Sequence, residues 1–302
     1  VADPDPVTLL AFLEKMEFKT ITRRVRETFE LEGAMPEEAV AEAVPIDRSA
    51  YVTIRDFAAL EAWIARATAQ GYVAVDTETD ALDAHESGLV GVSLALAPGE
   101  ACYIPLAHID PDAGDSDSGD MFGMDPPRQI NKDKALAALK TLLEDDSVLK
   151  IGHNFKYDVT VLARHGISAA PIDDTILLSF ALHAGDHQHG MDDLASRYFN
   201  HTCIAFKDVC GSGKKQITFD RVPLDKATEY AAEDADITLR LWHMFKPQLH
   251  KAKLTTVYET LERPLVPILS QMEAEGILVD RNRLSELSSD FAQTMARNEA
   301  RS

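Results

Sequence analysis

Apolar and polar positions along the chain predict a sheet with strands of more than one kind. The apolar run at 71–75 is typical of a buried strand, and it ends in the carboxylates of Asp76 and Glu78. Side chains alternate across a strand, so both carboxylates should point to the same face, about 6–7 Å apart. Two further apolar runs, 89–97 and 101–106, flank a Pro-Gly-Glu turn, which is a hairpin signal.

Apolar residues with helical spacing recur through most of the remaining chain. Asp225 is expected to be the N-cap of the longest helix, because a carboxylate can accept hydrogen bonds from the free amides of the first turn. Another strand is expected at 148–152. The predicted helices cover residues 7–30, 56–69, 132–143, 153–164, 174–183, 191–199 and 225–245. The predicted class is α/β, with helices packed around a mixed sheet that carries an antiparallel hairpin.

Two segments lack this periodicity. Residues 32–45 are rich in Ala, Glu and Pro and are expected to form a linker. Residues 110–125 contain six aspartates and no basic residue. A calcium-binding loop would need Gly at its sixth position and Glu at its twelfth, and neither is present. A solvated, mobile loop is therefore expected there.

Composition narrows the classes of protein that remain. The 302 residues are 45% hydrophobic, which is ample for a large core, and no apolar run is long enough to span a bilayer. The first residues lack the pattern of a signal peptide. The three cysteines are odd in number and not spaced as zinc ligands, which favours a reducing cytoplasm. A net charge of −20 disfavours nucleic-acid binding, unless bound divalent cations offset the carboxylates locally.

Four acidic residues and one tyrosine form the candidate site. Tyr230 and Asp234 are four residues apart on a predicted helix, so they share a face about 6 Å apart. Asp158 lies in the first turns of another helix, and Asp76 and Glu78 end the strand. A single helical aspartate usually lies in solvent or caps a helix. A strand pair, a helix-start Asp and a Tyr-x-x-x-Asp together indicate a site that binds cations.

Three motifs give this constellation a family resemblance. They are Asp76-Thr77-Glu78-Thr79-Asp80, Gly152-His153-Asn154-Phe155-Lys156-Tyr157-Asp158 and Tyr230-Ala231-Ala232-Glu233-Asp234-Ala235-Asp236. Their order resembles the proofreading 3′-5′ exonuclease domain of bacterial DNA polymerase I, in the DnaQ-like DEDD superfamily. The histidine subclass would place His where Glu229 stands, so the chain resembles the tyrosine subclass. The fold that this resemblance implies is ribonuclease H-like.

The resemblance also implies roles for individual residues. One divalent ion would be held by Asp76, Glu78 and Asp234, and a second by Asp76 and Asp158. Tyr230 would orient the attacking water. The ligands are all oxygen, so Mg²⁺ is expected and Mn²⁺ should substitute for it. The family positions that contact the terminal nucleotides of a frayed strand are matched by Thr79, Leu82, Asn154, Tyr157 and Phe206.

Simpler roles for three of these positions remain open. Leu82 and Phe206 could equally be core residues, and Asn154 could be only a helix cap. The structure distinguishes these alternatives by the exposure of the side chains and by their hydrogen bonds.

The resemblance divides the chain into three parts. Residues 1–47 would be an N-terminal helical remnant and linker, 48–255 the exonuclease domain, and 256–302 the helical start of a polymerase region. The implied function is release of nucleoside 5′-monophosphates from single-stranded or frayed DNA 3′ ends. The expected protein is a cytoplasmic monomer with no membrane partner, joined to a polymerase domain in the full-length chain. Two alternatives are an RNase D-like exonuclease that trims RNA 3′ ends, and a catalytically silent domain that docks DNA or braces the polymerase.

Overall fold

The computed structural model describes residues 46–109 and 128–301, together with 5–16 and a few positions between 18 and 29. The chain divides into two units, 1–43 and 44–302, each described by itself. In the first unit, helix α1 (Pro6–Lys15) covers the beginning of the helix expected at 7–30. The linker expected at 32–45 and the acidic loop expected at 110–125 lie outside the described residues.

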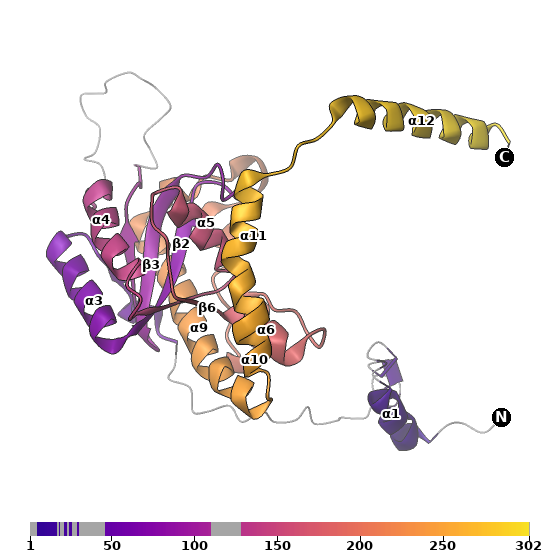
Figure 1. The fold of residues 1–302 in the computed structure, drawn as a ribbon. Coiled ribbons are helices and arrows are strands. Elements are labelled where there is room, and N and C mark those ends of the chain that lie inside the picture. The colour runs from indigo at the N-terminus through magenta and orange to yellow at the C-terminus, as the bar shows by residue number, and fades with distance from the viewer. Residues whose placement is uncertain are drawn as a thin grey trace. The chain divides into compact units, whose positions relative to one another are not determined.

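A six-stranded mixed sheet forms the centre of the second unit (Figure 1). Its strands are β1 (Val52–Thr53), β2 (Tyr72–Thr79), β3 (Leu89–Ala97), β4 (Glu100–Pro105), β5 (Leu149–Gly152) and β6 (Ile172–Asp174). Their order is β1-β4-β3-β2-β5-β6. The β2–β3 and β3–β4 pairs are antiparallel, whereas the β1–β4, β2–β5 and β5–β6 pairs are parallel. The predicted mixed sheet with an antiparallel hairpin is confirmed.

Helices cover both faces of the sheet, and β2 lies between them. Helices α3 (Phe57–Gln70) and α4 (Lys132–Leu143) pack in one core with Val73 and Val75. Helix α9 (Leu224–Lys251) packs on the other face, in a core that contains Ala74. Alternation along β2 therefore directs Asp76 and Glu78 toward α9.

The prediction that Asp225 caps α9 is wrong. The helix begins at Leu224 with Pro223 in the cap position, and no side chain caps it. Asp225 lies instead within the first turn, where its charge still favours the positive end of the helix dipole. The helix also continues past the expected end at 245 to Lys251, even though Pro247 lies inside it. The buried side chains of Phe245 and Leu249 pack in a core cluster and hold these last turns.

Shorter helices fill the remaining periphery. Helices α6 and α7 pack against α9 through a second core cluster. Among the described helices, none is both long and apolar enough to cross a bilayer. The bounds are α5 (Lys156–Ala163), α6 (Thr175–His183), α7 (Met191–Phe199) and α8 (Phe206–Cys210).

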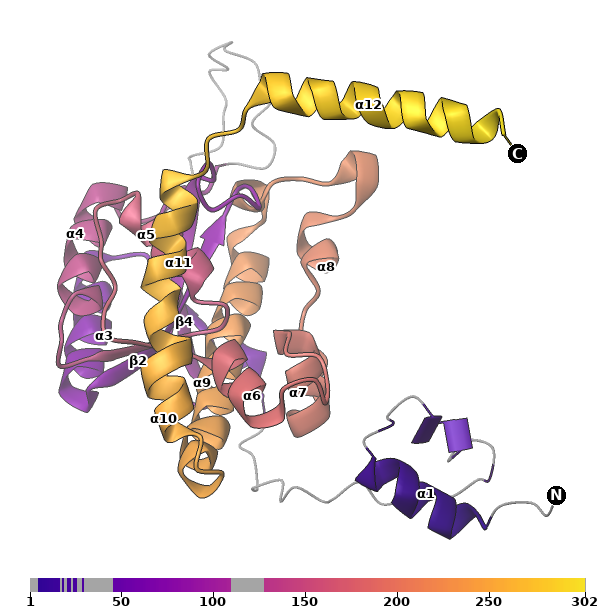
Figure 2. The same cartoon turned by 45° about the vertical axis from the view of Figure 1, so that its right-hand side comes forward.

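The C-terminal part of the chain packs on this domain well beyond residue 255. Helix α10 (Thr255–Val257) leads through a π-helical turn (Tyr258–Glu262) into α11 (Arg263–Glu275), which lies beside α5 (Figure 2). Tyr258 is fully buried and Val266 is 4% exposed, and both belong to the hydrophobic cores. In contrast, α12 (Arg281–Glu299) has no buried residue.

Candidate active site

Three carboxylates from two elements converge between β2 and α9. Oxygen atoms of Asp76, Glu78 and Asp234 all lie within 4.8 Å of one another. Small residues allow the helix to approach the strands this closely, because Ala74 and Ala95 of the sheet pack against the alanines of α9. The last residues of β2 and the middle of α9 therefore form the centre of the site.

A glycine on the neighbouring strand makes room for the side chain of Tyr103 near these carboxylates. Gly91 of β3 pairs with Glu78 of β2. A Cβ atom at Gly91 would lie 2.1 Å from the hydroxyl oxygen of Tyr103. No side chain fits at this position without displacing Tyr103, whose ring is fully buried.

Asp158 joins the site from the opposite face of β2. It lies in the first turn of α5 and is 2% exposed. Its Oδ1 atom accepts hydrogen bonds from the Thr77 backbone N (2.8 Å) and the Thr77 hydroxyl (2.6 Å). Asp158 is not one of the group whose oxygens lie within 4.8 Å, although its charge acts on the group, since it raises the pKa of Glu78. The structure thus brings together three of the four predicted acids tightly and places the fourth beside them.

No basic side chain of the described residues forms an ion pair with these four acids. Their negative charges are therefore not compensated, and the pKa values of the carboxyl groups are raised. Desolvation raises the pKa of all four well above the ordinary range of a carboxyl group. The neighbouring Asp234 further raises the pKa of Asp76, and Asp76 further raises that of Glu78. Glu78 Oε1 is buried without any hydrogen-bond partner among the described residues.

This donor set fits divalent cations. Like charges in a desolvated site are stable only when protonated or when bound to positive charge. The ligand atoms are all carboxylate oxygens, which Mg²⁺ and Mn²⁺ prefer, and Glu78 Oε1 has no hydrogen-bond partner among the described residues that would compete with a cation. Asp76, Glu78 and Asp234 could hold one cation, and the charge of Asp158 acts on the same group.

Tyr230 lies one turn before Asp234 on α9. Its ring packs against Phe219 and Phe206, with ring centroids 5.7 Å and 6.4 Å away. Burial raises the pKa of Tyr230 far above its usual value, and Asp234 raises it further. The phenol therefore keeps its proton at neutral pH, and its hydrogen bond to Asp234 lowers the pKa of that carboxyl.

Residues predicted to contact substrate lie around this centre. The Thr79 and Tyr157 hydroxyl oxygens are 2.6 Å apart and form a hydrogen bond, and each also lies within hydrogen-bond distance of the carbonyl oxygen of Ala81, at 2.8 Å and 3.0 Å. Leu82 is 93% exposed and Phe206 is 40% exposed, so neither is a core residue. These exposed apolar side chains are available for contact with a ligand.

Asn154 does not cap α5 with its side chain. Phe155 occupies the cap position of that helix, which has no side-chain cap. Asn154 itself is exposed and has a φ of 59° in the left-handed region, which asparagine tolerates. The backbone N–H groups of Asn154 and Phe155 donate to the carboxylate of Asp174 instead. The side chain of Asn154 is therefore not used as a cap.

Three residues near the site were not identified from the sequence. Thr77 binds Asp158 with two hydrogen bonds, and Asp174 holds the start of α5. The charge of Asp192, in the first turn of α7, raises the pKa of Asp234. Thr77 lies within the first motif, but only the position of α5 gives it a partner. Asp174 and Asp192 have the sequence pattern of ordinary helix-start acids.

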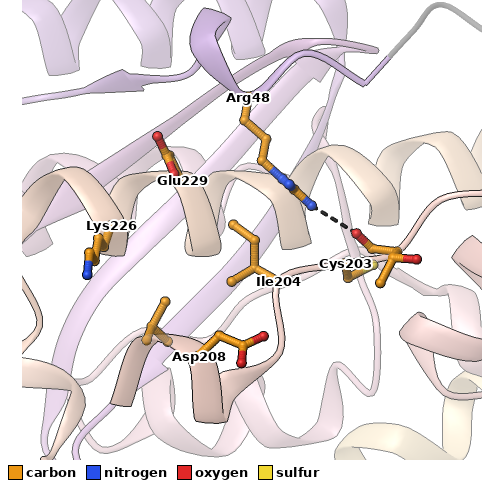
Figure 3. Close-up of a pocket in the computed structure, with 8 residues that line it drawn as sticks. Arg48, Cys203, Ile204, Asp208, Lys226 and Glu229 are labelled. Atoms are coloured by element: carbon orange, nitrogen blue, oxygen red, sulfur yellow. Dashed lines mark hydrogen bonds between the residues drawn. The ribbon is translucent and has the colours of Figure 1, made fainter. Parts of the chain in front are cut away.

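A second group of possible metal ligands includes Cys203, which also lines a cavity of about 440 Å³ (Figure 3). It contains His201, Cys203 and Glu233. Glu233 already accepts hydrogen bonds from Arg48 Nε, His201 Nε2 and the Ile204 backbone N, each at 2.7 Å. Since the Arg48 guanidinium supplies the positive charge here, this group does not fit a cation.

Fold and site together define a nuclease-type carboxylate centre, and comparison with known proteins agrees. Residues 51–250 match the family model described as 3′-5′ exonuclease. A DNA polymerase I of Rhizobium leguminosarum is 47% identical over 99% of this chain, which covers 30% of that protein. The chain thus spans less than a third of the length of this relative. We conclude that the chain belongs to the 3′-5′ exonuclease family.

Solved structures agree on the fold. The POL domain of Pol1 from M. smegmatis superposes with a TM-score of 0.58, at 21% identity, over 80% of this chain and 35% of that one. Escherichia coli RNase D superposes with a TM-score of 0.53, at 19% identity, over 76% of this chain and 51% of that one. The ribonuclease H-like fold class predicted from the motifs is confirmed.

Proposed function

We propose that this chain is the proofreading module of a DNA polymerase I and removes nucleoside 5′-monophosphates from DNA 3′ ends. The observation that supports this most directly is the cluster of Asp76, Glu78 and Asp234, which lacks a basic partner among the described residues. The family match and the 47% identity to a DNA polymerase I support the choice of reaction and substrate.

In this proposal the acids bind two divalent cations, with Mg²⁺ as the native ion and Mn²⁺ as a substitute. Asp76, Glu78 and Asp234 hold one cation, and Asp76 and Asp158 hold the other. Bound cations would supply Lewis-acid polarisation of the scissile phosphate and acidify the attacking water. Thr77 orients Asp158 through its two hydrogen bonds.

The protein groups position the reactants. Tyr230, which stays protonated, orients the attacking water through its hydroxyl, since a phenol with a raised pKa is a poor general base. Phe206 stacks on a base and Leu82 packs against the terminal nucleotide. Aromatic stacking is worth about 1–3 kcal/mol per base and is independent of sequence, as the removal of random mismatches requires.

The remaining contacts bind the end of the strand. Thr79 and Tyr157 form a hydroxyl pair beside the carboxylates, and Asn154 lies exposed at the start of α5. We assign these three residues to the sugar and phosphate of the terminal nucleotides. The substrate is a single-stranded or frayed DNA 3′ end, and the protein acts as a monomer joined to its polymerase domain.

An end-labelled single-stranded oligonucleotide tests the proposal. With Mg²⁺, we expect stepwise shortening from the 3′ end and release of 5′-monophosphates, and no shortening with EDTA. An RNA of the same sequence should be degraded much more slowly. Preferential digestion of the RNA would indicate an RNase D-like exonuclease. Binding of DNA without shortening, with either Mg²⁺ or Mn²⁺, would indicate a catalytically silent docking domain.

A further inference from the structure

Helix α5, which carries Asp158, is held between two other elements. Lys156 and Thr160 are four residues apart and share one face of the helix, whereas Asp158 is turned about 200° from Lys156. The Asp158 face contacts β2 through Thr77. The opposite face contacts α11.

Two polar contacts join α5 to α11. The Thr160 and Ser270 hydroxyl oxygens are 2.7 Å apart, and the two residues are only 5% and 8% exposed. The Lys156 ammonium donates to the Glu273 carboxylate, where it forms an ion pair. Val266 of α11 belongs to the same core cluster as residues 161 and 162 of α5. Side chains on both sides of Asp158 in sequence are thus fixed by α11.

The same C-terminal segment also holds the first residues of α5. The Asp174 carboxylate accepts from the backbone N of Asn154 (3.1 Å) and of Phe155 (2.8 Å). The backbone N of Asp174 in turn donates to the Tyr258 hydroxyl oxygen (2.9 Å), and Tyr258 donates to Asp173 Oδ1 (3.1 Å). The Tyr258 side chain is fully buried, which shields these hydrogen bonds from water.

We propose that residues 258–273 are a positioning element for Asp158, with Tyr258, Ser270 and Glu273 as its positioning residues. This segment lies outside residues 51–250 that match the exonuclease family. The proposal rests on the proposed function in one respect, which is that Asp158 binds a cation. Asp76, Glu78 and Asp234 lie on β2 and α9, so a shift of α5 would change the cation bound at Asp158 and leave the other one in place.

Mn²⁺ binding to the 302-residue chain, measured by calorimetry, tests this without relying on activity. The Asp158→Asn variant identifies the Mn²⁺ that depends on Asp158. In Ser270→Ala/Glu273→Gln, that Mn²⁺ should bind on the order of tenfold more weakly, as when a group that orients a metal ligand is lost. The matched control is Gln271→Ala/Glu275→Gln, which removes an amide and a carboxylate from the same helix, where they bond to each other. The control should bind Mn²⁺ as the parent does.

Two further readouts separate positioning from general destabilisation. Ser270→Thr keeps the hydroxyl, so this variant should bind Mn²⁺ nearly as tightly as the parent does. The Mg²⁺ concentration for half-maximal digestion should rise by a similar factor in the double variant, with the KM for DNA unchanged. If the double variant proves poorly folded, Glu273→Gln alone, on a half-exposed side chain, should show a smaller change in the same direction.

The outcomes distinguish this inference from the proposed function. Equal Mn²⁺ binding by the parent and the folded Ser270 and Glu273 variants would overturn the inference, even when the parent digests DNA. A parent that digests nothing would overturn the proposed function, while the comparison of Mn²⁺ affinities would still decide whether α11 positions Asp158.

Discussion

Helix α9 carries two kinds of acidic residue within a single turn. Glu233 is 1% exposed and is paired with Arg48, and Asp236 is fully buried and is paired with Arg240. Asp234, between them, forms no ion pair among the described residues and shares its space with Asp76 and Glu78. Two of these three acids are thus paired with an arginine, whereas Asp234 is surrounded by other carboxylates.

This contrast separates structural acids from candidate ligands. Asp236 also accepts from the Tyr51 hydroxyl and the Gly99 backbone N, so its lone pairs are satisfied by the chain itself. Buried Asp173 is similarly bonded to Lys246 and to other donors. Where the chain supplies the positive charge, the carboxylate stabilises the fold. Where it supplies none, the carboxylate must be protonated or bind a cation from solution.

The largest expected effect is on catalysis. Asp234→Asn should reduce the single-turnover rate of DNA digestion with Mg²⁺ by at least about 10³-fold, since losing one preorganised charge-stabilising group already costs about 10²–10³. The protein should remain folded, because the change removes a like-charge repulsion. A variant that kept a rate within tenfold of the parent would show that Asp234 is not a ligand.

For the neighbouring Asp236→Ala, the main effect should be on the stability of the fold. It removes the buried partner of Arg240 and should lower the free energy of unfolding by about 3–5 kcal/mol. Urea unfolding measures this, with Asp225→Ala as the control in the exposed first turn of the same helix, where the change should stay within about 0.5 kcal/mol. Equal stabilities of the two variants would contradict the structural role of Asp236.

Tyr230→Phe should have a smaller effect than the loss of a ligand. It removes the hydroxyl that orients the water and that hydrogen-bonds to Asp234, but it leaves every carboxylate ligand in place, so we expect a decrease of about 10–100-fold, similar to that for groups that orient ligands. The single-turnover rate with saturating Mg²⁺ measures this, because saturation with Mg²⁺ removes any effect of weaker cation binding. A decrease as large as that of Asp234→Asn would mean that Tyr230 does more than orient water.

The smallest effect is on stability as pH changes. Desolvation, with Glu233 and Asp192 nearby, raises the pKa of Asp234 in the folded protein, whereas an unfolded Asp has a pKa of about 3.9. The folded state therefore binds the extra proton, and stability falls as pH rises above about 4. In EDTA, the stability of Asp234→Asn relative to the parent should therefore increase as the pH rises from 4 to 8.

Urea unfolding of both proteins across this range measures the difference, which Mg²⁺ should reduce by binding the parent. A difference that did not change with pH would contradict a raised pKa of Asp234 in the folded protein. The comparison cancels the titration of groups far from Asp234, whereas the pKa values of Asp76 and Glu78 should also fall when the Asp234 charge is removed.

Local patterns predicted most of the elements. The helix expected at 132–143 has those bounds in the structure, and Asp56, at the expected start of its helix, caps α3 by accepting from the Ala59 backbone N. The strand ending in Asp76 and Glu78 was also found. The N-cap at Asp225 was not, because it depends on the path of the chain before the helix. Strands β1 and β6 are too short to produce a periodic signal.

The sequence alone determined the α/β class, the family and the candidate acids. These follow from hydrophobic periodicity and from the order of the motifs, which can be read along the chain without knowing how it folds. Only the tertiary structure decided which acids are paired. Arg48 reaches Glu233, and Tyr51 reaches Asp236, across more than 180 residues of chain. The free energy of a buried carboxylate depends on these distant neighbours, so the difference between Asp234 and Asp236 exists only in the folded protein.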